Sequence, residues 1–109
     1  MVLKDHIDWN AMTGRNPLVG PNDDYWGPRF VAMNDAYDRH LQQVGLEIGK
    51  ELNEKIQHGV YSCCSGPVYE TIAEQRLAAV VGVDALGMST TYEGKSIDLK
   101  SILIKFFGS

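Results

Sequence analysis

Apolar residues recur at every third or fourth position through the middle of the chain, with charged and polar residues between them. The members of this stripe are Met33, Tyr37, Leu41, Val44, Ile48 and Leu52. A period near 3.6 residues is typical of a helix with one buried face. Gly45 and Gly49 lower the helix propensity without removing the period. The pattern therefore predicts a long helix over about residues 32–56.

Two short apolar runs predict strands on either side of a second helix. The run GVYSCCS at residues 59–65 ends at the Gly66-Pro67 turn, and the run VDALGM occupies residues 83–88. Between these runs a helical period extends from residue 69 or 70 to residue 81. Gly82 follows, as glycine commonly does where a helix ends.

Strand, helix and strand in this order form a βαβ unit at about residues 60–89, whose two strands must be parallel. The predicted fold is α/β, with a mixed, largely parallel sheet and flanking helices. Ligands of such sheets bind beyond the carboxyl ends of the strands. The first strand leads to Tyr69 and Glu70, and the second leads to Met88 and Ser89. We therefore expect these two polar clusters to share one edge of the sheet.

The two ends of the chain are less regular. Residues 1–9 start with a short apolar run that predicts the tail of a strand. Residues 10–28 are rich in Gly, Pro, Asn and Asp and predict a long loop, which is either functional or held by a neighbouring subunit. Four apolar residues near the carboxyl terminus, Leu99, Ile102, Leu103 and Phe106, are spaced for one helical face. That segment either covers its own domain, lies on a membrane or is an unrelated tail.

Composition narrows the class of protein. With 109 residues the chain has the length of one domain, and its net charge of -4 argues against a nucleic-acid partner, which needs a basic face. The adjacent Cys63 and Cys64 point to opposite faces of a strand, so we expect free thiols in a reducing compartment. No signal peptide is apparent, and no apolar run approaches the ~20 residues of a membrane span. We expect a cytoplasmic protein without a membrane partner.

The residues alone leave two interpretations of Glu70 open. A carboxylate in the first turn of a helix interacts favourably with the helix dipole, and Glu74 fits the same structural role. Alternatively, Glu70 accepts hydrogen bonds from a flat ligand while Tyr69 packs on its face. Ser89 is an ordinary loop hydroxyl by pattern alone. The three histidines lack the spacing of a zinc site, and the glycines form no dinucleotide or P-loop fingerprint.

Six segments together resemble the trimeric purine nucleoside phosphorylase family. In chain order they are KDHI (4–7), NPLVGPND (16–23), GPRF (27–30), DAYDR (35–39), GPVYETIAEQR (66–76) and GVDALGMST (82–90). The resemblance implies that residues 1–90 are the central part of a phosphorylase domain with a phosphorylase/hydrolase-like fold. Residues 91–109 diverge from the family. The implied reaction is phosphorolysis of inosine- or guanosine-type nucleosides to free purine and ribose 1-phosphate. Inorganic phosphate is the co-substrate, and no cofactor or metal is needed.

The resemblance also implies roles for individual residues. Tyr69 and Glu70 would bind the purine, Met88 the ribose and Ser89 the phosphate. Phe30 would reach the site of a neighbouring subunit in a homotrimer. The Tyr-Glu-Thr stretch favours inosine and guanosine over methylthioadenosine, because methylthioadenosine phosphorylases have small polar residues there. No residue of this chain matches a catalytic residue of the family.

Other substrate-binding residues of the family pattern have no counterpart in this chain. They include an Arg, a His and a Ser that bind phosphate, an Asn that donates to the purine and a His near the sugar. We therefore expect the chain alone to be inactive, as a truncated phosphorylase. An alternative is a non-enzymatic chain that associates with full-length subunits. A small nucleotide-binding module is a poorer interpretation, because a phosphate-binding loop is missing.

Overall fold

The structure is a computed structural model that describes residues 1–92. Its elements in chain order are β1 (Val2–Asp8), α1 (Trp9–Met12), α2 (Arg39–Glu51), β2 (His58–Cys63), α3 (Ile72–Val80) and β3 (Ala85–Gly87). The helical face expected around residues 99–106 lies outside the described residues. Within residues 1–92, no helix combines the length and apolar character needed to cross a bilayer.

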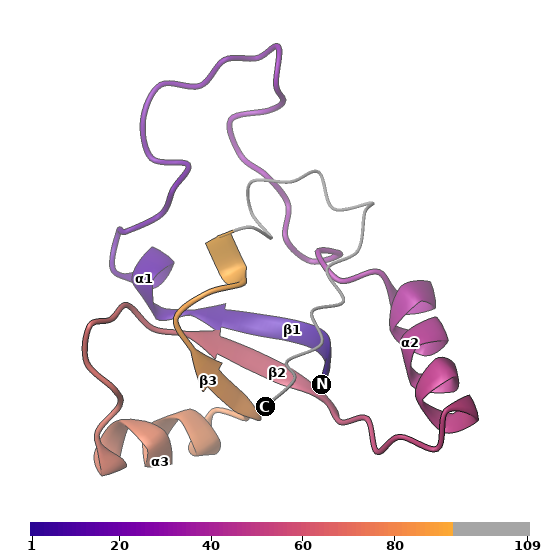
Figure 1. Cartoon of the computed structure of the whole chain (residues 1–109). Coiled ribbons are helices and arrows are strands. Elements are labelled where there is room, and N and C mark those ends of the chain that lie inside the picture. The colour runs from indigo at the N-terminus through magenta and orange to yellow at the C-terminus, as the bar shows by residue number, and fades with distance from the viewer. Residues whose placement is uncertain (93–109) are drawn as a thin grey trace.

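The three strands form one sheet in the order β1-β2-β3, with both pairs parallel. Cys63 at the end of β2 pairs with Asp8 at the end of β1 and with Gly87 at the end of β3. The carboxyl ends of all three strands therefore meet at one edge, which Figure 1 shows as three arrowheads pointing the same way. The predicted βαβ unit with parallel strands is confirmed, and the apolar run at the amino terminus is a full strand of the same sheet.

The middle strand contributes most of the buried residues of the sheet. Tyr61, Ser62 and Cys63 are all buried, and Val2 and Ala78 join them from β1 and α3. Alternate residues of a strand point to opposite faces, so β2 has buried side chains on both faces. This explains why its sequence does not alternate between apolar and polar residues as that of a half-exposed strand would.

The first long helix is shorter than predicted at both ends, and it stops at Glu51 rather than at residue 56. Helix α2 begins at Arg39 instead of residue 32, because the Asp38 side chain caps it by accepting a hydrogen bond from the Leu41 amide at 3.0 Å. Tyr37 belongs to the apolar stripe but not to the helix. Its hydroxyl lies 2.9 Å from Nδ1 of His6 in β1, and the two rings meet edge to face. Tyr37 is thus apolar in the pattern because the segment before α2 packs against the sheet there.

The second helix also begins later than predicted. Helix α3 starts at Ile72, with Thr71 as its N-cap. The Thr71 side chain accepts a hydrogen bond from the Glu74 amide at 3.3 Å, and the Glu74 carboxylate accepts one from the Thr71 amide at 2.6 Å. This reciprocal pair is a capping box. Glu70 therefore lies before the helix and not in its first turn, while the capping role expected for Glu74 is confirmed.

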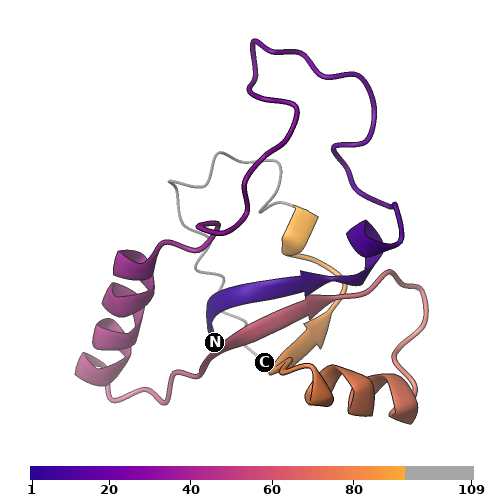
Figure 2. The same ribbon diagram turned by 180° about the vertical axis from the view of Figure 1, so that it is seen from behind.

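The long loop is longer than predicted and starts with a turn of helix. Helix α1 takes up Trp9–Met12, and irregular backbone then continues from residue 13 to residue 38. Figures 1 and 2 show this segment projecting away from the sheet, with α2 beside the amino end of β1. Near its end this segment returns to the sheet, where Tyr37 contacts His6 of β1.

Candidate active site

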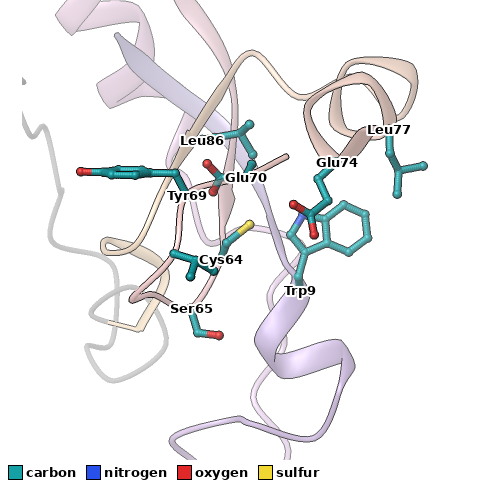
Figure 3. Close-up of a pocket in the computed structure, with 9 residues that line it drawn as sticks. Trp9, Cys64, Ser65, Tyr69, Glu70, Glu74, Leu77 and Leu86 are labelled. Carbon is teal, nitrogen blue, oxygen red and sulfur yellow. The ribbon is translucent and has the colours of Figure 1, made fainter. Parts of the chain in front are cut away.

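An open cavity of about 240 Å³ lies at the carboxyl edge of the sheet. Its lining residues are Trp9, Cys64, Ser65, Val68, Tyr69, Glu70, Glu74, Leu77 and Leu86. They come from the segments that follow β1 and β2, from α3 and from β3 itself (Figure 3). A cavity at this edge is where a parallel sheet of this topology places its ligand.

The exits of β2 and β3 lie side by side, as the sequence predicted. The Cys64 amide donates a hydrogen bond to the Gly87 carbonyl at 2.9 Å. Further on, Met88 lies against the loop after β2, because a Cβ added to Gly66 would stand only 2.9 Å from the Met88 sulfur. The chain segments that carry Glu70 and Met88 are therefore held together by the backbone.

The Glu70 side chain reaches into the cavity. Its atom Oε1 is buried and accepts no hydrogen bond from the described residues. Figure 3 shows the carboxylate near Cys64 and Leu86. Because Thr71 and Glu74 cap α3 between themselves, the carboxylate of Glu70 is not used by the helix. A buried acceptor without a donor normally has a partner that supplies one, so this oxygen is suited to an N–H of a ligand.

The other predicted site residues are placed differently. Tyr69 borders the cavity, but its ring is 85% exposed and points away from Glu70 in Figure 3. Ser89 is outside the cavity lining, and its amide donates a hydrogen bond to the Tyr61 hydroxyl at 3.3 Å. Phe30 is 89% exposed and borders a separate hollow on the long loop. The structure thus brings Tyr69, Glu70 and Met88 to one edge, with Ser89 next to them and Phe30 elsewhere.

The remaining titratable side chains of the described part of the chain show no arrangement suited to a metal. Within residues 1–92, no three His, Cys, Asp or Glu side chains are grouped closely enough to hold an ion. Nε2 of His58 lies 2.8 Å from the Gln42 side-chain oxygen. Cys63 and Cys64 are both free thiols, the first buried and the second partly exposed.

Comparison with known proteins explains this arrangement. The family model of the phosphorylase superfamily matches residues 1–95. The chain belongs to this superfamily. The purine nucleoside phosphorylase of Mus musculus is 47% identical over 95 residues, which are 85% of this chain and 33% of that protein. Purine nucleoside phosphorylase 1 of Bacillus subtilis is 47% identical over 93 residues, with the same coverage of both chains.

Solved structures give the same answer for the fold. Purine nucleoside phosphorylase of Schistosoma mansoni in complex with inosine superposes with a TM-score of 0.83 at 40% identity. The match covers 86% of this chain and 34% of that chain. This chain of the phosphorylase superfamily thus has a purine nucleoside phosphorylase fold over the matched part, and it spans about a third of the length of these relatives.

Trp9 and Leu86 line the cavity but were not among the residues predicted from the sequence. Trp9 directly follows β1, and Leu86 lies within β3. Trp9 could have been found by treating the apolar run at the amino terminus as a third parallel strand, since the residue after such a strand lies at the same edge. Leu86 gave no signal of its own, because an apolar residue in a short strand is equally compatible with either face.

Cys64 provides a prediction about the chemistry next to Glu70. Burial first, and then the neighbouring Glu70 carboxylate, raise the pKa of the Cys64 thiol to about 11. The side chain is therefore a neutral thiol at pH 7, and we expect alkylation by iodoacetamide to be slow and to accelerate as the pH rises toward that value. Glu70→Gln removes a negative charge, so it lowers the pKa of Cys64 and speeds alkylation at pH 8.

Peptide mass spectrometry over a pH series measures this reactivity. The fully buried Cys63 is the internal control and should stay unmodified in both proteins. Equal alkylation rates of Cys64 with and without the Glu70 carboxylate would show that the two groups do not interact.

Proposed function

We propose that the protein is a purine nucleoside phosphorylase that cleaves inosine- or guanosine-type nucleosides with inorganic phosphate. The observation that carries this proposal is the Glu70 carboxylate, which has a buried oxygen without a donor at the cavity and no part in capping α3. The sequence relatives named as purine nucleoside phosphorylases support it. Solved structures of purine nucleoside phosphorylase support it as well, since they include the Schistosoma mansoni protein in complex with inosine and a Schistosoma protein in complex with guanosine.

In the proposed reaction a phosphate oxygen bonds to C1′ of the ribose while the C1′–N9 bond breaks. The electron pair of that bond goes to the departing purine, which takes up a proton. Glu70 accepts a hydrogen bond from a ring N–H of the purine and so holds the base in position in the cavity. No cofactor takes part, and the products are free purine and ribose 1-phosphate.

Other residues of the site position the substrates. Leu86 and Cys64 give the cavity an apolar wall beside Glu70. Tyr69 turns its exposed ring onto the purine face when the base is bound. Met88 binds the ribose through its backbone, and Ser89 binds phosphate. Holding the two reactants in this geometry lowers the entropic part of the barrier.

The exposed aromatic residues support a proposal about assembly. Tyr69 and Phe30 are 85% and 89% exposed, so these residues do not enclose a purine within a single described chain. We propose that Phe30 completes the site of a neighbouring subunit in a cytoplasmic homotrimer. We propose also that the 109-residue chain alone has no measurable turnover.

The test starts from the native protein, whose intact mass shows whether it is heavier than the 12.1 kDa of these residues. We expect it to release hypoxanthine from inosine only when phosphate is present, with ribose 1-phosphate as the second product. The 109-residue chain, assayed in parallel, should release none. Release of hypoxanthine without phosphate, or no release by the native protein, would overturn the proposed function. Turnover by the short chain would overturn only its proposed inactivity.

A further inference from the structure

The turn after β3 has an unusual backbone. Thr90 has a φ of +81°, which L-residues with a branched β-carbon rarely adopt, and its side chain is only 3% exposed. The Thr91 amide donates a hydrogen bond to the Ser89 carbonyl at 3.0 Å, which closes the turn. A backbone of this kind persists only where its surroundings hold it in place. The turn therefore needs an anchor in the sheet.

Tyr61 on β2 provides that anchor. Its side chain is 4% exposed, and its hydroxyl oxygen accepts the hydrogen bond from the Ser89 amide at 3.3 Å. The ring passes close to Gly87, since a Cβ added to Gly87 would lie 3.2 Å from Cζ and 3.3 Å from Cε2 of Tyr61. A residue of the middle strand thus reaches past the end of β3 to the first residue of the turn.

We propose that Tyr61 is a positioning residue for phosphate, acting through Ser89. This inference rests on the proposed function, in which Ser89 binds phosphate. The Ser89 hydroxyl lies 3.3 Å from the Thr90 hydroxyl, so the direction of the hydroxyl depends on how the turn is held. Tyr61 holds the backbone nitrogen of Ser89 in place, and this sets the position of the Ser89 hydroxyl that would bind phosphate.

The position of Tyr61 makes its effect selective. Tyr61 is absent from the lining of the cavity that contains Glu70, Cys64 and Leu86. Loss of its hydroxyl should therefore weaken phosphate binding while it leaves nucleoside binding unchanged. A residue that served only the stability of the sheet would affect both substrates, or neither.

The test compares Tyr61→Phe with Tyr37→Phe in the native protein. Both variants remove one phenolic oxygen. The Tyr37 hydroxyl lies 2.9 Å from Nδ1 of His6, the residue of β1 that pairs with Tyr61, so Tyr37→Phe changes the neighbourhood of Tyr61 while it leaves the bond from the Ser89 amide to the Tyr61 hydroxyl in place. For Tyr61→Phe we expect the KM for phosphate to rise roughly 5- to 10-fold, as for the loss of one hydrogen bond. The KM for inosine should stay within about twofold. Tyr37→Phe should change neither KM.

A double variant and a binding measurement complete the test. If Tyr61 acts through Ser89, adding Tyr61→Phe to Ser89→Ala should raise the KM for phosphate little further. Phosphate should also raise the melting temperature of the wild-type protein, and it should do so less for Tyr61→Phe. Equal changes in both KM values, no change in either, or equal stabilisation of both proteins by phosphate would overturn the inference. If the protein bound phosphate in this Tyr61-dependent way but failed to cleave inosine, only the proposed function would fall.

Discussion

Glu70→Gln should lower kcat/KM for inosine by about 100-fold, because a hydrogen bond to a charged group contributes about 1.5–3 kcal/mol. The amide has nearly the shape of the carboxylate, so the cavity is preserved. Its NH2 group, however, can face the purine N–H as a second donor, and the negative charge is lost. The KM for phosphate should change little, because Ser89 lies outside this cavity. Steady-state kinetics with each substrate varied in turn measures both effects.

Glu47→Gln is the matched control for this substitution. Glu47 is exposed on α2 and accepts a hydrogen bond from the Gln43 side chain at 2.7 Å, far from the cavity lining. The Glu47→Gln substitution makes the same chemical change at a distance from the site. It should leave kcat/KM for inosine within about twofold of the wild-type value. If Glu70→Gln also kept activity within about threefold of the wild type, Glu70 would not be the residue that binds the purine.

Gly87→Ala should destabilise the protein by about 1–3 kcal/mol, the usual cost of adding a methyl group to a packed site. The new Cβ would meet the hydroxyl and ring of Tyr61, which is buried and has little room to move. We expect the substitution to displace Tyr61 from Ser89 as well, so the KM for phosphate should rise with the loss of stability. Denaturant unfolding and kinetics on the same preparation measure the two effects together.

A double variant identifies the cause of this destabilisation. Tyr61→Phe removes the atom that lies nearest to the new methyl group, so Gly87→Ala should cost less stability in the Tyr61→Phe background than alone. Purely additive losses would mean that the methyl group is accommodated without contact with Tyr61. The destabilisation would then come from elsewhere in β3.

The strands were predictable because their signals are local. The runs at residues 59–65 and 83–88 are short, apolar and bounded by glycine and proline, and the helical segment between them requires parallel strands. The starts of the two helices were missed for different reasons. Tyr37 contributes to an apolar stripe but serves a contact with His6 in β1, which only the folded chain reveals. Thr71 and Glu74 have the spacing of a capping box, a signal that is present in the sequence but was not used to place the start of the helix.

The sequence predicted which edge of the sheet carries the candidate site. It did not predict how the individual side chains are placed there. The parallel order brings Glu70 and Met88 together, as expected from the pattern. The direction of the Tyr69 ring depends on the loop after Pro67, and the position of Ser89 depends on the left-handed backbone at Thr90. The contact between Tyr61 and Ser89 depends on the register of β2 and β3, which no short stretch of sequence specifies.

The capping box at Thr71 and Glu74 has a consequence for how such a protein can diversify. Helix α3 is capped by Thr71 and Glu74, so the side chain at position 70 is not needed to cap that helix. With the purine-binding role proposed for Glu70, a change at this single position would alter which nucleobase is accepted without removing the cap of helix α3. Descendants of one ancestral scaffold can therefore acquire new substrate preferences in few mutational steps.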